Sequence, residues 1–205
     1  MKQIIITFLL FLSFNSFSQN DNLYQFESKK EVLNNSILEI SYPFFKNGTY
    51  ANDINSIIQQ KIEEIKSETI DLLNTISPDE SKNYLINYVV SVKYLNQKVL
   101  SIEFEYDGFT GGAHNNVIIE YININLQNGK KIMINDIVAK EKQDDLFTEL
   151  IKLWKKEETV TELAEITKEE IFKEGNFFFT EKTLNFSIYQ SYIDGYRVLS
   201  VPLEK

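Results

Sequence analysis

The residues best able to do chemistry lie in one stretch, EFEYDGFTGGAH, from Glu103 to His114. His114 is the chain's single histidine, and Asp107 precedes it closely. A histidine beside a carboxylate can act as a general base, so this pair suggests a hydrolase. A lone histidine without assembled partners more often makes a structural hydrogen bond. The hydrolase using His114 and Asp107 is therefore the alternative interpretation.

Three carboxylates alternate in the same stretch, at Glu103, Glu105 and Asp107. In a strand this spacing puts all three on one face, opposite Phe104 and Tyr106. A carboxylate pair at a suitable separation can hydrolyse a glycosidic bond. The simpler interpretation is the polar, solvated side of the strand. The clustered acids could also receive a basic partner.

The sequence predicts no metal and no cofactor. One histidine and no cysteine leave at most one nitrogen or sulfur ligand for zinc. No EF-hand spacing, Walker loop or nucleophile elbow occurs. The sequence does not decide whether the protein is an enzyme, but it favours a non-catalytic protein.

The elements expected to position this stretch indicate an α+β fold. It is an antiparallel β-meander with helices packed on it, in two intertwined α/β modules. We expect Pro43 to end the second strand and Asn52 to cap the long helix. Asn135 or Asp136 should cap the later helical region. The expected strands are two within 23–45, then 84–94, 99–106, 117–126, 131–134, 177–179, 184–189 and 197–203, and the expected helices are 52–76, 145–158 and 167–172.

The N-terminus has the layout of a secretory signal peptide over residues 1–18. Lys2 precedes an apolar run from Ile4 to Phe14, and Ser16-Phe17-Ser18 resembles a cleavage site. We therefore expect export to the periplasm or the exterior, with cleavage after Ser18. No later run is long and apolar enough to be a membrane anchor.

The charge balance limits the classes of partner. The formal net charge is −9, and it becomes −10 when residues 1–18, with Lys2 as their one charged side chain, are removed. An acidic chain is poorly suited to nucleic acid, whose phosphates require clustered Lys and Arg. It suits a basic partner, or none.

The stretch Thr110-Gly-Gly-Ala-His114 resembles a known family. Together with Ser101–Tyr106, Glu120–Leu126, Asn128-Gly-Lys130 and Ile134–Ile137, it is similar to an extracytoplasmic domain of unknown function. This domain occurs in the lysozyme-sensing anti-sigma factor RsiV and beside the catalytic domain of the peptidoglycan deacetylase PdaC. Ile40–Pro43 and the start of the first helix resemble its N-terminal companion module. The resemblance implies modules at 19–97 and 98–205 that form one compact unit.

The leading hypothesis is a non-catalytic binding protein of the cell envelope. The resemblance implies a basic protein such as lysozyme, or a cell-wall glycan, as the ligand. The alternatives are a hydrolase acting on the cell wall and a structural envelope module without a soluble ligand. The residues expected to bind lie in or beside two loops and are Tyr106, Asp107, Phe109, Thr110, His114 and Tyr192.

Overall fold

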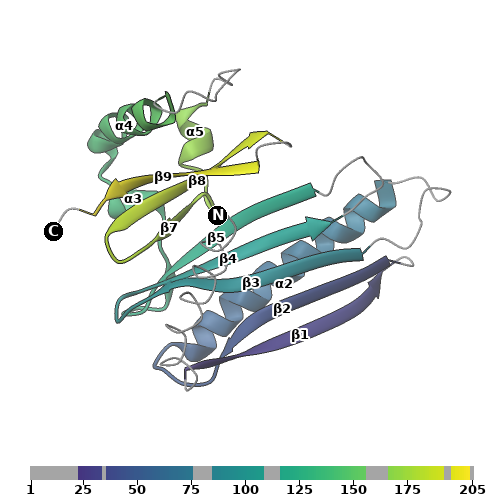
Figure 1. The fold of residues 1–205 in the computed structure, drawn as a ribbon. Helices are drawn as coiled ribbons and strands as arrows, with labels where there is room; N and C mark the ends of the chain where they lie inside the picture. Colours follow the sequence, from purple (N-terminus) through teal and green to yellow (C-terminus); the bar gives the residue numbers. More distant parts are fainter. Residues whose placement is uncertain are drawn as a thin grey trace, which may run out of the picture.

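The fold consists of two β-sheets with helices on their outer faces (Figure 1). This computed structural model describes residues 23–33, 36–75, 85–108, 116–155, 166–191 and 195–203. Sheet A contains β1 (Tyr24–Leu33), β2 (Ser36–Phe45), β3 (Leu85–Leu95), β4 (Val99–Gly108), β5 (Asn116–Asn125) and β6 (Lys130–Lys131). Sheet B contains β7 (Phe177–Phe179), β8 (Thr183–Ser191) and β9 (Gly195–Pro202). The helices are α2 (Ala51–Thr75), α3 (Ile134–Ile137), the 3-10 turn η1 (Lys140–Lys142), α4 (Gln143–Lys155) and α5 (Lys168–Ile171). The predicted α+β class is confirmed.

The strands of sheet A follow chain order, and one neighbouring pair is parallel. β2 and β3 run parallel, whereas the other neighbours are antiparallel. The chain between β2 and β3 includes α2, and a parallel pair needs a crossover of this kind. Sheet A therefore joins strands from both sides of residue 97.

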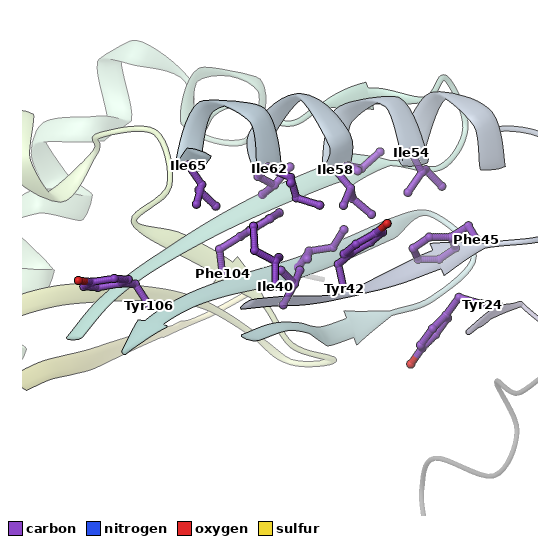
Figure 2. Close-up of a cluster of buried hydrophobic side chains, with 14 of the residues drawn as sticks. Tyr24, Ile40, Tyr42, Phe45, Ile54, Ile58, Ile62, Ile65, Phe104 and Tyr106 are labelled. Carbon is purple, nitrogen blue, oxygen red and sulfur yellow. The ribbon is translucent and has the colours of Figure 1, made fainter. Parts of the chain in front are cut away.

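The larger core lies between α2 and one face of sheet A (Figure 2). The buried stripe Ile54, Ile58, Ile62 and Ile65 keeps the three- and four-residue spacing of one helix face. Figure 2 shows these side chains pointing at the strands. The even-numbered residues of β4 meet them, which are Leu100, Ile102, Phe104 and Tyr106.

The second core lies between sheet B and the short helices. Its centre includes Leu150 and Trp154 of α4, Ile171 of α5 and Phe186 of β8. A capping box begins α5, because the Thr167 hydroxyl accepts from Glu170 N–H and the Glu170 carboxylate accepts from Thr167 N–H.

Arg197, the chain's single arginine, joins β9 to the last turn of α4. Its guanidinium donates to Trp154 O at 3.0 Å and to Leu153 O at 3.3 Å. It also lies 4.7 Å from the centre of the Trp154 ring. The side chain thus satisfies helix-end carbonyls that have no partner within the helix.

Arg197→Lys is expected to lower the free energy of unfolding by about 1 kcal/mol, because an ammonium cannot reproduce the two-pronged contact or the stacking. Urea unfolding followed by circular dichroism measures the change. Val198→Ala, at the exposed neighbour on β9, should stay within about 0.5 kcal/mol of wild type. An equal loss in both variants would contradict the assigned role.

Several local predictions were wrong. β2 continues through Pro43 to Phe45, because its pairing with β3 already ends at Ser41 and no donor is needed there. α2 starts at Ala51, before Asn52. The strand expected at 131–134 is only Lys130–Lys131, since Ile134 begins α3.

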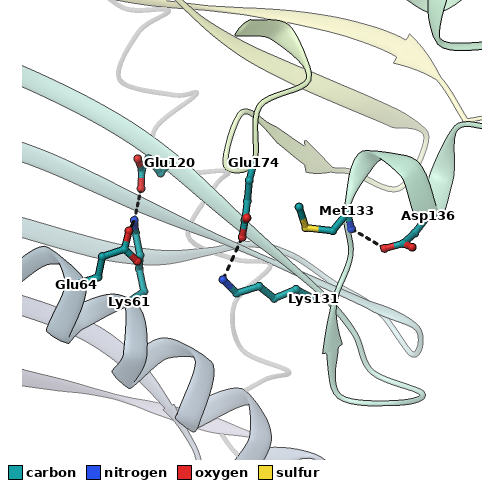
Figure 3. Close-up of polar contacts among 7 residues, drawn as sticks. All are labelled: Lys61, Glu64, Glu120, Lys131, Met133, Asp136 and Glu174. Atoms are coloured by element: carbon teal, nitrogen blue, oxygen red, sulfur yellow. Dashed lines mark hydrogen bonds and ion pairs between the residues drawn. The ribbon is translucent and has the colours of Figure 1, made fainter. Parts of the chain in front are cut away.

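Two further corrections concern a bulge and a cap. The alternation expected to 94 breaks between Val92 and Tyr94, so Tyr94 packs against the second core. The cap of α3 is Met133, whose N–H donates to Asp136 at 2.8 Å (Figure 3). The expected ends of helices 52–76 and 145–158, and Tyr84, lie outside the described residues.

Candidate functional site

The described residues cover only part of the face of sheet A opposite α2. β7 contacts β3, β4 and β5 near one end of this face. Beyond β7 the face carries two rows of side chains, fixed by the pairing of β2, β3 and β4. We call this surface the open face; its residues are Glu39, Asn87 and Asp107 in one row and Ser41, Val89 and Glu105 in the next.

The open face combines carboxylates with exposed apolar groups. Glu39 and Asp107 are exposed, and Glu105 is half-buried. Val89 lies between the acids and is 52% exposed, while Val117, opposite Asp107 on β5, is 38% exposed. Neighbouring strands lie about 4.8 Å apart, so the three acids occupy one small patch.

Basic groups lie only at the margins of this patch among the described side chains. Lys30 on β1 approaches Glu39 at 3.7 Å, with both side chains largely solvated. Such an exposed pair contributes little to stability. Lys93 is engaged with Glu103 at 3.0 Å beside the covered end.

Glu103 does not lie on a solvated strand face, as the simpler interpretation of the carboxylate series expected. Its side chain is 9% exposed, because β7 covers this end of the sheet. Its carboxylate accepts hydrogen bonds from Tyr121 Oη at 2.9 Å, Ser91 Oγ at 3.3 Å and Lys93 Nζ at 3.1 Å. The three alternating acids are therefore divided into one buried and two accessible groups.

Tyr121 belongs to the same buried network. Burial, and then the Glu103 carboxylate, raise the pKa of the Tyr121 hydroxyl above its usual value. The hydroxyl thus stays protonated and donates a hydrogen bond to Glu103. Its ring stacks on Phe178 with the ring centres 4.6 Å apart. One ring of the triple phenylalanine therefore packs on sheet A, away from the second core.

A polar seam holds sheet B against sheet A. Asn123 Nδ2 donates to Phe177 O at 2.7 Å, and Phe179 N–H donates to Ser101 Oγ at 3.1 Å. Ser101 Oγ also donates to Asn123 Oδ1 at 2.6 Å. These bonds satisfy backbone groups of β7 and fix where sheet B ends and the open face begins.

An ion-pair cluster fixes β5 from the α2 side (Figure 3). Lys61 of α2 lies 2.6 Å from Glu120 of β5 and 3.0 Å from Glu64. Burial lowers the pKa of Lys61, but the hydrogen bonds and charges of Glu120 and Glu64 outweigh it and leave that pKa raised. Figure 3 also shows Lys131 reaching Glu174, which ties β6 to the segment before β7.

The structure separates the two predicted binding residues that it describes. Tyr106 is buried on the α2 face, where its ring covers the position that a side chain at Gly108 would occupy. Asp107 is exposed on the open face. The other four predicted residues, Phe109, Thr110, His114 and Tyr192, lie outside the described residues.

Sequence reasoning missed the β2 and β3 members of the open face. Glu39 and Val89 alternate with buried neighbours, so the strand period could have placed them on an outer face. Their position beside Glu105 and Asp107 depends on the parallel pairing of β2 with β3.

The described residues offer two observations on metal and small-molecule binding. No group of three or more His, Cys, Asp or Glu side chains among them is placed to hold a metal ion. A depression bounded by Tyr121, Lys131 and Gly175 has room for about one water molecule.

In the part of the chain that the structure describes, no helix is long and apolar enough to cross a membrane.

Comparisons with known proteins agree with this architecture. Residues 26–117 match the family model described as deacetylase PdaC. A comparison with curated proteins finds no match. The resemblance to RsiV remains a prediction.

Two solved DUF3298-family structures share the fold. The one from Bacteroides fragilis has a TM-score of 0.63 at 16% identity, covering 87% of this chain and 90% of its own. The one from Pseudomonas aeruginosa has a TM-score of 0.64 at 15% identity, covering 90% and 93%. Residues 26–117 are therefore similar to the PdaC family model, and the chain shares the fold of the two DUF3298-family structures.

Proposed function

We propose that this chain is an exported, non-catalytic binding protein of the cell envelope that receives a basic protein of the lysozyme kind on the open face. The observation that carries the proposal is the patch of Glu39, Glu105 and Asp107 around the exposed Val89. Protein interfaces commonly combine an apolar centre with charges that complement the partner. The net charge of −9 would attract a basic protein over a longer range.

The test is a binding titration with purified lysozyme as the basic probe. We expect Glu39→Gln/Glu105→Gln/Asp107→Asn to raise Kd about tenfold, because the variant removes three complementary charges from one surface. Raising the salt concentration should weaken the wild-type complex, since salt screens exposed charges.

A matched control removes three exposed carboxylates from α2 on the other side of sheet A, as Glu63→Gln/Glu68→Gln/Asp71→Asn. It changes the net charge equally, so it should leave Kd nearly unchanged. If both triple variants weaken binding equally, the attraction is a general charge effect. If wild type shows no salt-sensitive binding to lysozyme, the proposal is wrong.

A cell-wall glycan is the alternative ligand. Binding to insoluble peptidoglycan that persists at high salt, with no binding to lysozyme, would favour it. In that case the exposed Val89 and the hydrogen-bonding side chains of the open face would matter more than its net charge.

A hydrolase acting on the cell wall is the second candidate function. The PdaC match carries the description of a deacetylase, and Asp107 is accessible at the end of β4. Under this hypothesis His114→Ala should abolish release of product from peptidoglycan. Under the binding hypothesis neither wild type nor this variant should release product, and the variant should change stability or nothing.

A further inference from the structure

The outer edge of sheet A at β1 presents a long row of backbone groups. β1 pairs with β2 on one side and is the terminal strand of the sheet. Lys46 N–H donates to Leu23 O, which continues the register of Tyr24 with Phe45. Bonded and non-bonded pairs alternate in an antiparallel ladder, so the odd-numbered residues bond to β2. The even-numbered residues direct their N–H and C=O groups outward.

Three outward-facing residues have no backbone partner on this edge within the part of the chain that the structure describes. No described residue makes a backbone hydrogen bond to Phe26, Ser28 or Lys30 on the outer side. The Phe26 side chain is 54% exposed and that of Val32 is 72% exposed. A long edge with exposed apolar side chains is a template for another strand.

We propose that β1 pairs antiparallel with β1 of a second copy of this chain, about a two-fold axis at Ser28. The two six-stranded sheets then form one continuous sheet across the dimer. This interface uses the edge of the sheet and is independent of the proposed ligand-binding function.

The charges along β1 select this register. A two-fold axis perpendicular to the sheet keeps both α2 helices on one face and lies midway between one residue of β1 and the same residue of the partner. Centring on Ser28 sets Glu27 opposite the partner's Lys29 twice, which is favourable across two strands. Centring on Lys29 instead sets that lysine against its own copy and Glu27 against the partner's Glu31. Centring on Lys30 opposes two lysines directly.

The same register covers the exposed apolar side chains. Phe26 would lie opposite the partner's Lys30, whose alkyl stem can pack on an aromatic ring. Val32 would lie opposite the partner's Tyr24 and diagonal to its Phe26. Edge lysines disfavour addition of most strands, so a strand with glutamate in the matching position would be selected.

Charge reversal tests the proposal. Lys29→Glu and Glu27→Lys each place like charges opposite one another, so each alone should weaken self-association at least about tenfold. An equimolar mixture of the two variants restores both opposite-charge pairs and should form a heterodimer. Sedimentation velocity over a concentration series measures all three samples and wild type.

A backbone variant provides a second, independent test. The Ser28 N–H points away from β2, so Ser28→Pro removes an outward donor and leaves the β1–β2 ladder intact. We expect Ser28→Pro to be monomeric at concentrations where wild type and Ser28→Thr are dimeric, with similar thermal unfolding. A monomeric wild type at high concentration, or a mixture of charge variants that stays monomeric, overturns the proposal.

Discussion

Phe104→Ala is expected to lower the free energy of unfolding by about 3–5 kcal/mol, the largest effect among these predictions. Phe104 is 2% exposed in the larger core. Figure 2 shows it between the strands and Ile62 and Ile65 of α2. Removal of the ring leaves a cavity that a helix and a sheet, each held by its own backbone bonds, cannot close. Equilibrium unfolding in urea measures the loss.

Two variants make this measurement specific. Phe104→Leu keeps much of the volume and should cost clearly less than Phe104→Ala. Phe26→Ala removes the same group from a side chain that is 54% exposed, so its cost should stay below about 1 kcal/mol. If Phe26→Ala and Phe104→Ala lower the free energy of unfolding equally, the packing of α2 on sheet A does not contribute the 3–5 kcal/mol expected here, about the cost of removing a buried phenyl ring.

Glu103→Ala is expected to cost about 2–3 kcal/mol, because it leaves the buried Tyr121 hydroxyl without its acceptor. Lys93 is 37% exposed, so the ion pair itself adds little to this figure. Since Glu103 lies beneath β7, the loss should also loosen sheet B. Hydrogen exchange should therefore increase first at the backbone N–H of Phe179, which donates to Ser101 next to this network.

Two controls separate the hydrogen bonds from the charge. Glu103→Gln retains an oxygen that can accept from Tyr121, so it should recover more than half of the lost stability. Glu105→Ala removes the next acid on the same strand face, where the side chain is half-buried, and should cost less than about 1 kcal/mol. Equal losses at Glu103 and Glu105 would show that the buried network has no special importance.

Local patterns in the sequence were reliable wherever the physical signal is itself local. The helical spacing of Ile54, Ile58, Ile62 and Ile65 requires only one apolar stripe, and it predicted α2 within a residue of its start. The capping box at Thr167 depends on a contact three residues away. The meander of β3, β4 and β5 follows from alternation and a short turn at Asn96.

Predictions failed where a distant segment decides the result. Pro43 is tolerated inside β2 because the pairing of β2 with β3 ends at Ser41. The sequence around Pro43 does not show where that pairing ends. Tyr94 changes core because a bulge turns the end of β3 toward sheet B. Both outcomes depend on which strand lies alongside, and strand period does not encode a pairing partner.

By itself the sequence determined the α+β class, the helices α2, α4 and α5, most of the strands, the acidic balance and the placement of Glu103, Glu105 and Asp107 on one strand face. Only the tertiary structure decided that β7 buries Glu103, while Asp107 joins Glu39 and Val89 on the open face. The physical reason is that alternation along a strand defines two faces but not what covers them. Sheet B packs on one end of this face of sheet A through hydrogen bonds to Asn123 and Ser101. That end is buried, and the other end is exposed to solvent.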